Sequence, residues 1–414
     1  MGGGLLQLVA YGAQDVYLTG NPQITFFKVV YRRHTNFAIE AIEQTFNGTP
    51  GYGNRVTCQI SRNGDLIHRM YLSLQVTDDK PLCAFYGLRV INYVEIEIGG
   101  QKIDKHYSHW LYIWNELSLP KSKRTGYNKM VGQSGGSLID QTLYIPLEFW
   151  FCRNVGLALP LIALQYHEVK INIQFETADL CRGSGTALTN TFPISTLWVD
   201  YVFLDTDERR RFAQLSHEYL IEQLQFTGSE SVSSTKLNSK LSFNHPCKEL
   251  VWFANKRKSD GSAEENLISN NINWFNYTTG HTAISTTLPY DYNSMVLHNN
   301  AVTSTNPIDT AKLILNGNDR FSVRPGSYFN LIQPFQHHEN IPTNAGINVY
   351  SFALKPEEHQ PSGTLNMSRI DTATLSIDFK AGAGLDTNTT LNVYAVNYNV
   401  LRILSGMGGL AYSN

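Results

Sequence analysis

Residues 156–175 read GLALPLIALQYHEVKINIQF, and the second half of this stretch carries the pattern that decides the fold. Apolar side chains occupy every second position there, namely Val169, Ile171, Ile173 and Phe175, and the residues between them are polar. Successive side chains of a β-strand point to opposite faces. The alternation therefore predicts a strand with one buried face and one face in water.

The same strand pattern occurs a second time, 204 positions further along, in ATLSIDF at residues 373–379. Another pair follows the same order, with VEIEIGG at residues 94–100 and AKLILNG at residues 311–317. Both members of this pair end in a dipeptide typical of tight hairpin turns. A weaker match relates residues 56–74 to residues 241–254. The sequence therefore predicts one β unit present twice, with a period too long for a solenoid repeat.

The overall composition excludes several classes of protein. The formal net charge is only −2, and aromatic residues do not interleave with a basic stripe, so direct nucleic-acid binding is not expected. No apolar run is long enough for a transmembrane segment, and no signal peptide is expected. The 5 cysteines are scattered without a CxxC pair, which argues against a disulfide framework and a zinc site. We expect folding in a reducing compartment.

Along the chain, short strands and turn signals predominate, which is typical of an all-β sandwich or barrel. Residues 1–25 are expected to form an N-terminal arm, and strands are expected from residue 24 to residue 42. Residues 108–117 (SHWLYIWNEL) predict a helix capped by Ser108, and residues 120–137 predict a surface loop. A strand is expected at residues 144–151. Asp205 to Glu208 resembles a capping box, and we place a domain boundary near residue 213.

Four groups of residues have types that could carry chemistry. Ser134 lies in a G-x-S-x-G pattern, but the basic loop before it is not the strand that a nucleophile elbow requires. His106 and His109 lie near Asp104 without further ligands at metal-site spacing, so two exposed histidines at a turn and helix start are favoured. Glu95 and Glu97 share one face of a strand and are interpreted as its wet face rather than as a glycosidase pair. His337-His338-Glu339 matches no motif. No catalytic, cofactor-binding or metal-binding residue is predicted.

Several long stretches resemble the major capsid proteins of nucleocytoplasmic large DNA viruses, most closely those of chlorella viruses. They include LVAYGAQDVYLTGNPQITFFKVVYRRHTNFAIE, EIGGQKIDKHY, GLALPLIALQYHEVK, WVDYVFLDT, HEYLIEQLQFTGSE and NYNVLRILSGMGGLAY, and together they extend over nearly the whole chain. The resemblance implies a double jelly roll, that is, two tandem eight-stranded β-sandwiches at residues 26–212 and 213–414. It also implies a non-enzymatic structural protein whose trimers form pseudo-hexagonal capsomers of an icosahedral shell, or alternatively a minor capsid paralogue at a special shell position.

The resemblance further implies partners and modifications. Neighbouring capsomers would contact the trimer, and the N-terminal arm would meet minor capsid proteins beneath the shell. The protein would be made and assembled in the host cytoplasm. Members from chlorella viruses carry covalent glycans outside the usual sequon, so the N-x-S/T sequons at Asn47, Asn276, Asn366 and Asn388 are poor guides. Asn276, Asn299 and Asn388 are glycosylation candidates, and no cofactor is expected.

Two other hypotheses remain open from the sequence. Jelly rolls also occur in lectins, so a carbohydrate-binding module is one alternative, and it predicts a concave cluster of aromatic and polar side chains. A hydrolase that uses Ser134 is the other. Fold alone does not distinguish these functions, whereas the extent of the resemblance favours the capsid protein.

Overall fold

The computed structural model describes residues 3–10, 12–183, 188, 191–255, 267–268, 271–272, 274–278, 305–381 and 389–412. The chain divides into two units, residues 1–36 and residues 37–414. The described part of the first unit contains two short helices, α1 (Gly3–Val9) and α2 (Val16–Thr19), and no strand. The strand prediction for residues 24–42 is therefore wrong for its first part, because the first strand begins at Phe37.

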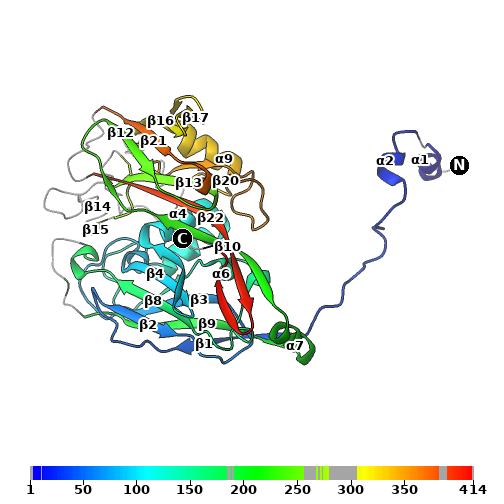
Figure 1. The fold of residues 1–414 in the computed structure, drawn as a ribbon, viewed down its shortest axis with the longest axis horizontal. Coiled ribbons are helices and arrows are strands. Elements are labelled where there is room, and N and C mark those ends of the chain that lie inside the picture. Colours follow the sequence, from blue (N-terminus) through cyan, green and yellow to red (C-terminus); the bar gives the residue numbers. More distant parts are fainter. Residues whose placement is uncertain are drawn as a thin grey trace. The chain divides into compact units, whose positions relative to one another are not determined.

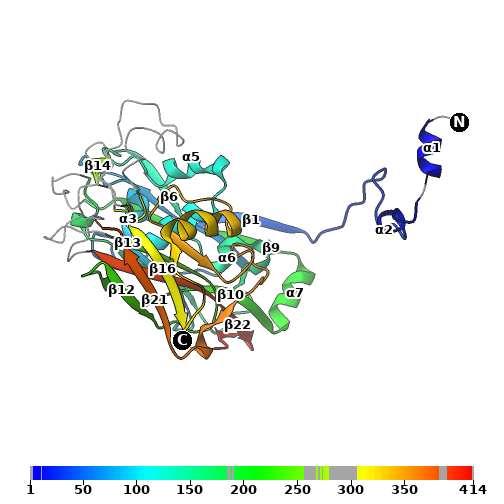
Figure 2. The ribbon, with the colours of Figure 1, turned by 90° about the horizontal axis from the view of Figure 1, so that it is seen from above.

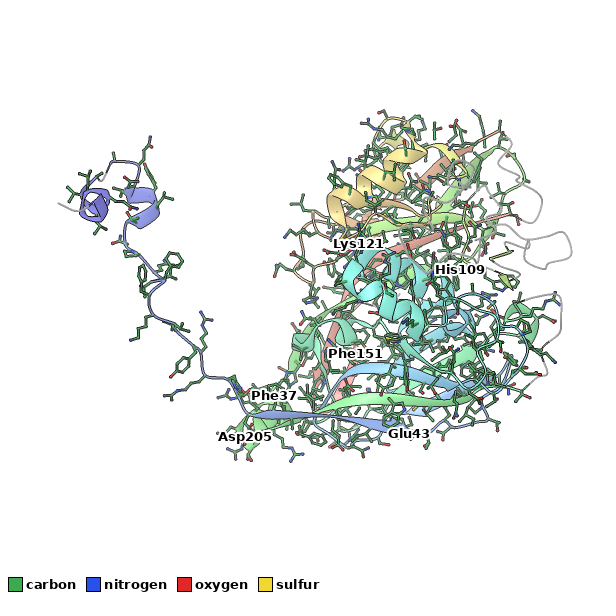
Figure 3. The ribbon with its side chains drawn as sticks, turned by 180° about the vertical axis from the view of Figure 1, so that it is seen from behind. Phe37, Glu43, His109, Lys121, Phe151 and Asp205 are labelled. Carbon is green, nitrogen blue, oxygen red and sulfur yellow. The ribbon has the colours of Figure 1, made fainter. Side chains whose placement is uncertain are left out.

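The first half of the second unit is a β-sandwich made of two antiparallel sheets. One sheet has the order β1-β9-β3-β6, and the other has the order β2-β8-β4-β5. Their bounds are β1 (Phe37–Gln44), β2 (Arg55–Gln59), β3 (Leu66–Gln75), β4 (Ile91–Ile98), β5 (Gln101–Tyr107), β6 (Thr142–Pro146), β8 (Val169–Phe175) and β9 (Ile194–Leu204). In Figure 3, Phe37 and Asp205 lie at one end of the first sheet and Glu43 toward the other, in agreement with the pairing of Phe37 with Leu204.

The second half repeats this topology strand for strand. Its two sheets have the orders β10-β22-β13-β19 and β12-β21-β16-β17. Their bounds are β10 (His217–Phe226), β12 (Lys236–Leu241), β13 (Pro246–Asn255), β16 (Ile308–Leu315), β17 (Asn318–Asp319), β19 (Asn348–Ser351), β21 (Ala373–Phe379) and β22 (Thr390–Leu404). The paired strands β12, β21 and β16 lie side by side in Figure 2. The chain is thus a double jelly roll, as the family resemblance implies.

The predicted internal duplication is confirmed at the level of single residue pairs. Ile96 pairs with Ile171 between β4 and β8, and Leu313 pairs with Leu375 at the equivalent positions of β16 and β21. A β-bulge follows Ile91 in the first copy and Ile308 in the second. The turn after each strand also repeats, since Gly99-Gly100 and Asn316-Gly317 all have positive φ values, which a tight hairpin of this type requires.

The sheet β10-β22-β13-β19 is buried on both of its faces. Trp252 and Leu250 of β13 belong to the core inside the second sandwich. Phe253 and Val251, which point to the opposite face, belong to the core that continues into the first sandwich. Helix α4 (Ser108–Ser118) supplies much of that contact, because Trp110 packs 5.7 Å from Tyr394 between ring centroids. Figure 1 shows α4, β10 and β22 in the region where the two sandwiches meet.

The remaining described elements are short connections and edge strands. They are α3 (Tyr86–Arg89), α5 (Lys121–Met130), α6 (Trp150–Arg153), η1 (Val155–Leu157), β7 (Leu159–Pro160), η2 (Ala178–Leu180), α7 (Thr206–Gln214), β11 (Glu230–Ser231), β14 (Leu267–Ile268), β15 (Asn271–Ile272), β18 (Arg324–Pro325), η3 (Tyr328–Ile332), α9 (Gln333–His337), β20 (Leu365–Asn366), η4 (Met367–Arg369) and β23 (Met407–Leu410).

The helices test several local predictions. The helix expected at residues 108–117 is present, but Ser108 does not cap it, because its hydroxyl donates to the carbonyl of Leu88 instead. Asp205 does cap α7, and its carboxylate accepts from the backbone N–H of Thr206. The strand expected at residues 144–151 is only partly right, since β6 ends at Pro146 and α6 begins at Trp150.

The surface loop predicted for residues 120–137 is wrong for its first part, which forms α5. A glycine within the helix and a run of basic residues hide this element in the sequence. The helix is held by a contact with α4, because Arg124 pairs with the carboxylate of Glu116 at 3.0 Å and also donates to its carbonyl. Tertiary packing here outweighs local propensity.

Candidate functional site

Ser134 does not lie in a nucleophile elbow. It follows helix α5 rather than a strand, and the next element after it is strand β6 rather than a helix. A cavity of about 450 Å³ lies beside it, and the described residues that line this cavity include no histidine, aspartate or glutamate. A serine nucleophile needs an adjacent base to become reactive. The arrangement around Ser134 therefore gives no support to the hydrolase hypothesis.

His106 and His109 do not converge on a metal site. Nε2 of His106 lies 2.9 Å from Oδ2 of Asp104, whereas Nδ1 of His109 lies 2.7 Å from the hydroxyl of Tyr277. No group of three possible metal ligands occurs among the described residues. The expectation that both histidines are exposed is wrong, because His106 is buried under Phe149 and His109 is partly buried where α4 meets the second sandwich.

Glu95 and Glu97 lie on one face of β4, as the alternation predicts, but Glu95 is buried rather than wet. Its carboxylate lies 2.5 Å from Arg55 and 3.8 Å from Lys102. The amide of Asn172 donates to both glutamates. Glu95 is thus engaged by a cation and an amide within the sheet, and this arrangement gives no support to a glycosidase pair.

The three glycosylation candidates differ in what the structure describes. Asn276 is partly buried, and its side-chain oxygen accepts hydrogen bonds from the backbone and hydroxyl of Thr278, at 3.0 and 2.7 Å. Asn299 and Asn388 lie outside the described residues. Among the other sequons, Asn366 lies in the short strand β20, and Asn47 forms an isolated bridge with Thr57.

A buried charged cluster, which matches no sequence motif, lies on the face of β13 that is turned toward the first sandwich, because Glu249 is on the same face as Val251 and Phe253. His338 follows α9 and has no exposed side-chain surface. Its two ring nitrogens lie 3.0 Å from Glu249 and 2.8 Å from Glu357. Burial alone lowers the pKa of His338, but the two carboxylates outweigh burial and raise the pKa to about 9. His338 therefore carries a positive charge at neutral pH.

The cluster continues toward the first sandwich. Glu222 of β10 lies 2.8 Å from the fully buried ammonium group of Lys248. The same carboxylate accepts a hydrogen bond of 2.9 Å from Arg153 of α6. The Arg153 guanidinium also stacks 3.9 Å from the ring centroid of Trp114. These contacts join helices α4 and α6 of the first sandwich to strands β10 and β13 of the second.

A groove of about 960 Å³ opens beside this junction, on the outer face of the sheet that contains β3 and β6. Helices α4 and α5 and the residues after β6 form its walls, and Figure 3 labels Lys121 of α5 and Phe151 of α6, two of the three helices that border it. Tyr71 and Tyr144 lie in the groove with ring centroids 6.0 Å apart. Tyr71 also stacks in parallel on Trp198 at 6.3 Å. The groove is thus a concave surface rich in aromatic rings.

Exposed apolar side chains form a further feature of unit 37–414. Phe335 of α9 is 74% exposed and Leu354 is 72% exposed. They belong to neighbouring segments, because His337 is within 2.9 Å of the Leu354 carbonyl. Exposed apolar side chains on neighbouring segments are suited to contact with another surface. The described helices include none that is long and apolar enough to cross a membrane.

Comparison with known proteins agrees with the double jelly roll. The family described as "Large eukaryotic DNA virus major capsid protein" matches residues 208–409, and the family described as "Major capsid protein N-terminus" matches residues 25–205. The chain is 54% identical to the major capsid protein of Pyramimonas orientalis virus and 48% identical to that of Paramecium bursaria Chlorella virus 1, over the full length of both partners in each case.

Solved structures show the same relationship. The chain superposes on the VP54 structure of PBCV-1 with a TM-score of 0.80 at 42% identity, and the match covers 94% of this chain and 100% of that one. The Faustovirus major capsid protein shares the fold, with a TM-score of 0.73 at 14% identity over 95% of this chain and 94% of that one. The resemblance noted in the sequence is confirmed.

Proposed function

The chain belongs to the major capsid protein family of large eukaryotic DNA viruses, and from this premise we propose that it is a structural protein of an icosahedral virion shell. Three copies form one capsomer of pseudo-hexagonal outline, and neighbouring capsomers tile the shell. The protein is made and assembled in the host cytoplasm. The chain acts by association and catalyses no reaction.

The observation that carries this proposal is the repeated sandwich. Ile96 pairs with Ile171, and Leu313 pairs with Leu375, in the same register of two equivalent sheets. A trimer of such chains presents six similar sandwiches and approximates a hexagon with only three copies. Soluble homo-oligomers usually have closed point-group symmetry, of which a three-fold ring is one form. The exposed apolar residues on α9 and at Leu354 are suited to such contacts.

The test is the mass of the purified soluble chain by light scattering. We expect about three times 46.6 kDa, unchanged on dilution, together with ring-shaped particles in negative stain. The double substitution Phe335→Ser and Leu354→Ser should weaken the trimer, whereas Leu404→Ser, which removes another exposed leucine, should not. A stable monomer of the unmodified chain at micromolar concentration would contradict the trimeric capsomer.

We also infer that residues 1–25 are an arm that binds minor capsid proteins beneath the shell. Tyr17 and Leu18 are highly exposed in unit 1–36, as is Leu8. Exposed apolar side chains of this kind need a partner surface. A chain that lacks residues 1–25 should still form trimers but should fail to retain minor proteins in assembled particles. Normal retention of the minor proteins by the shortened chain would contradict this role.

The limits of the two sandwiches, at residues 26–212 and 213–414, and the glycan positions are proposals as well. Helix α7 connects β9 to β10, which supports a limit near residue 213, and limited proteolysis should cut there before it cuts within either sheet system. Covalent glycans are expected at Asn276, Asn299 or Asn388, and peptide mass mapping of virions tests each position. Asn276 requires local opening of its contact with Thr278 to react.

A further inference from the structure

We propose that the groove between β3, β6 and α5 binds a neutral carbohydrate, an activity separate from assembly. The groove has the size of small-molecule sites, at about 960 Å³. It is concave and lined mainly by apolar and aromatic atoms, with a few polar groups among them. Binding sites in proteins commonly have this composition. Four features of its lining select the class of ligand.

The first feature is an aromatic platform on the outer face of the sheet. Tyr71 is held flat by its parallel stack on Trp198, and Tyr144 meets it at an interplanar angle of 68°. Tyr144 is 42% exposed although its backbone is fixed in β6. Rigid aromatic rings offer apolar area with little loss of side-chain entropy on binding. The apolar face of a pyranose ring is a suitable partner for such a surface.

The second feature is a set of polar groups that the protein leaves unused. Arg69, Glu148 and Asp200 all line the groove, and no ion pair or side-chain hydrogen bond joins any of them to another described residue, although Arg153 and Arg69 attract the Glu148 carboxylate at longer range. The hydroxyl of Tyr127 also lacks a hydrogen-bond partner among the described residues, and only 8% of the surface of Tyr127 is exposed. Buried polar groups without partners are rare in folded proteins. A ligand with many hydroxyl groups can satisfy donors and acceptors together.

The third feature is the balance of charge. Arg69 and Lys123 are opposed by Asp200 and Glu148 in the same lining. The groove therefore has no strong preference for an anion or a cation. A neutral ligand is recognised instead through hydrogen bonds and ring contacts.

The fourth feature separates the groove from the charged cluster beside it. Arg153 and Glu357 also line the groove, but their charges are already engaged, with Glu222 and His338 respectively. These two residues fix the walls rather than offer free groups. The sugar contacts are consequently assigned to Tyr71, Tyr144 and Asp200. A concave cluster of aromatic and polar side chains is what the sequence predicts for a carbohydrate-binding module. The groove is such a cluster, and it lies on the fold of a capsid protein.

The experiment uses the full chain in its native oligomeric state. Saturation-transfer difference NMR and calorimetry are performed with cellohexaose, laminarihexaose and maltohexaose as probes. We expect at least one oligosaccharide to bind with a dissociation constant in the millimolar range or below. Tyr144→Ala should weaken that binding about fivefold or more through loss of ring contact. Asp200→Asn, which keeps the shape of the side chain, should weaken it as well.

The matched control is Tyr412→Ala, which removes a tyrosine that is 60% exposed and does not line the groove. This variant should bind the oligosaccharide unchanged. No binding of any probe at millimolar concentration, or equal binding by Tyr144→Ala and the unmodified chain, overturns the proposal. Loss of trimer mass in Tyr144→Ala without any sugar binding shows instead that a second copy covers the groove. Capsomer formation itself is read separately, by light scattering of the unmodified chain.

Two further binding experiments identify the source of the carbohydrate. In one experiment the protein is applied to immobilised polysaccharide from the host surface. In the other it is applied to immobilised copies of the same chain before and after periodate oxidation of any glycans they carry. Binding in the first experiment indicates attachment to the host, and periodate-sensitive binding in the second indicates contact between glycosylated copies. Binding in neither experiment, with free oligosaccharides also inactive, contradicts the carbohydrate site.

Discussion

His338 Nε2 lies 3.0 Å from Glu249 Oε2 in a place where neither side chain has any exposed surface. A buried carboxylate and a buried imidazole each lose hydration on folding, and the pair recovers this cost only when both are charged. The pKa of Glu249 is lowered because His338 and Lys248 outweigh the effect of burial. The pair therefore ties the loop after α9 to the centre of β13.

We expect the stability of the second sandwich to fall at alkaline pH. The pKa of His338 is about 9 in the folded chain, raised above an unfolded value of about 6.5. The charged His338 contributes about 3 kcal/mol to the free energy of unfolding. This contribution is fully present below about pH 6.5 and is lost as the pH rises through about 9. Denaturant unfolding at a series of pH values measures how the free energy of unfolding changes with pH, that is, its slope against pH. His338→Gln should flatten it, and the neighbouring substitution His337→Gln should leave it unchanged.

Glu222 and Glu218 provide a matched test of buried and exposed charge on the same strand, β10. Glu222→Gln leaves the ammonium group of Lys248 buried without its partner and should lower the free energy of unfolding by about 3–5 kcal/mol. Glu218 pairs with Arg402 at the surface, so Glu218→Gln should change the free energy of unfolding by less than about 1 kcal/mol. Thermal unfolding of both variants gives the comparison. Equal effects would mean that the buried network contributes nothing beyond an ordinary surface pair.

Two glycines should respond in opposite ways to substitution by alanine. Gly126 lies inside α5, where an added Cβ meets nothing within 4 Å, so Gly126→Ala should stabilise the chain by about 0.5–1 kcal/mol. A Cβ at Gly326 would lie 2.2 Å from the carbonyl oxygen of Ile308, so Gly326→Ala must displace the backbone of β16 and destabilise the second sandwich. Calorimetry distinguishes the two shifts in melting temperature. A lower melting temperature for Gly126→Ala would show that α5 is strained.

The cysteines should be inert in the folded protein. All five are buried and free, as the absence of a disulfide pattern predicts. Burial raises the pKa of Cys58 to about 11 and that of Cys83 to about 12, so almost no thiolate is present near neutral pH. A thiol reagent should label none of them in the native capsomer and all five after denaturation. Rapid labelling of one cysteine under native conditions would locate a segment that opens.

The sequence by itself determined the two matched pairs of strands, their repetition and the family. Alternation in residues 169–175 and 373–379 is a local property, since it follows from which face of a strand meets water, and both strands are present with the predicted bounds. The hairpins at Gly99-Gly100 and Asn316-Gly317 are equally local, because positive φ is a property of the residues in the turn. The duplication followed from comparing such local patterns along the chain.

Only the tertiary structure decided what buries the second face of a sheet and which distant charges meet. Strand β13 shows no alternation, because Trp252 faces one core and Phe253 faces another, and a strand buried on both sides has no polar face to reveal its orientation. His338 meets Glu249 across 89 positions of sequence, which no local pattern encodes. The groove likewise collects Arg69, Tyr144 and Asp200 from three strands. Contacts of this kind arise from sheet order and packing, so they become visible only once the chain is folded.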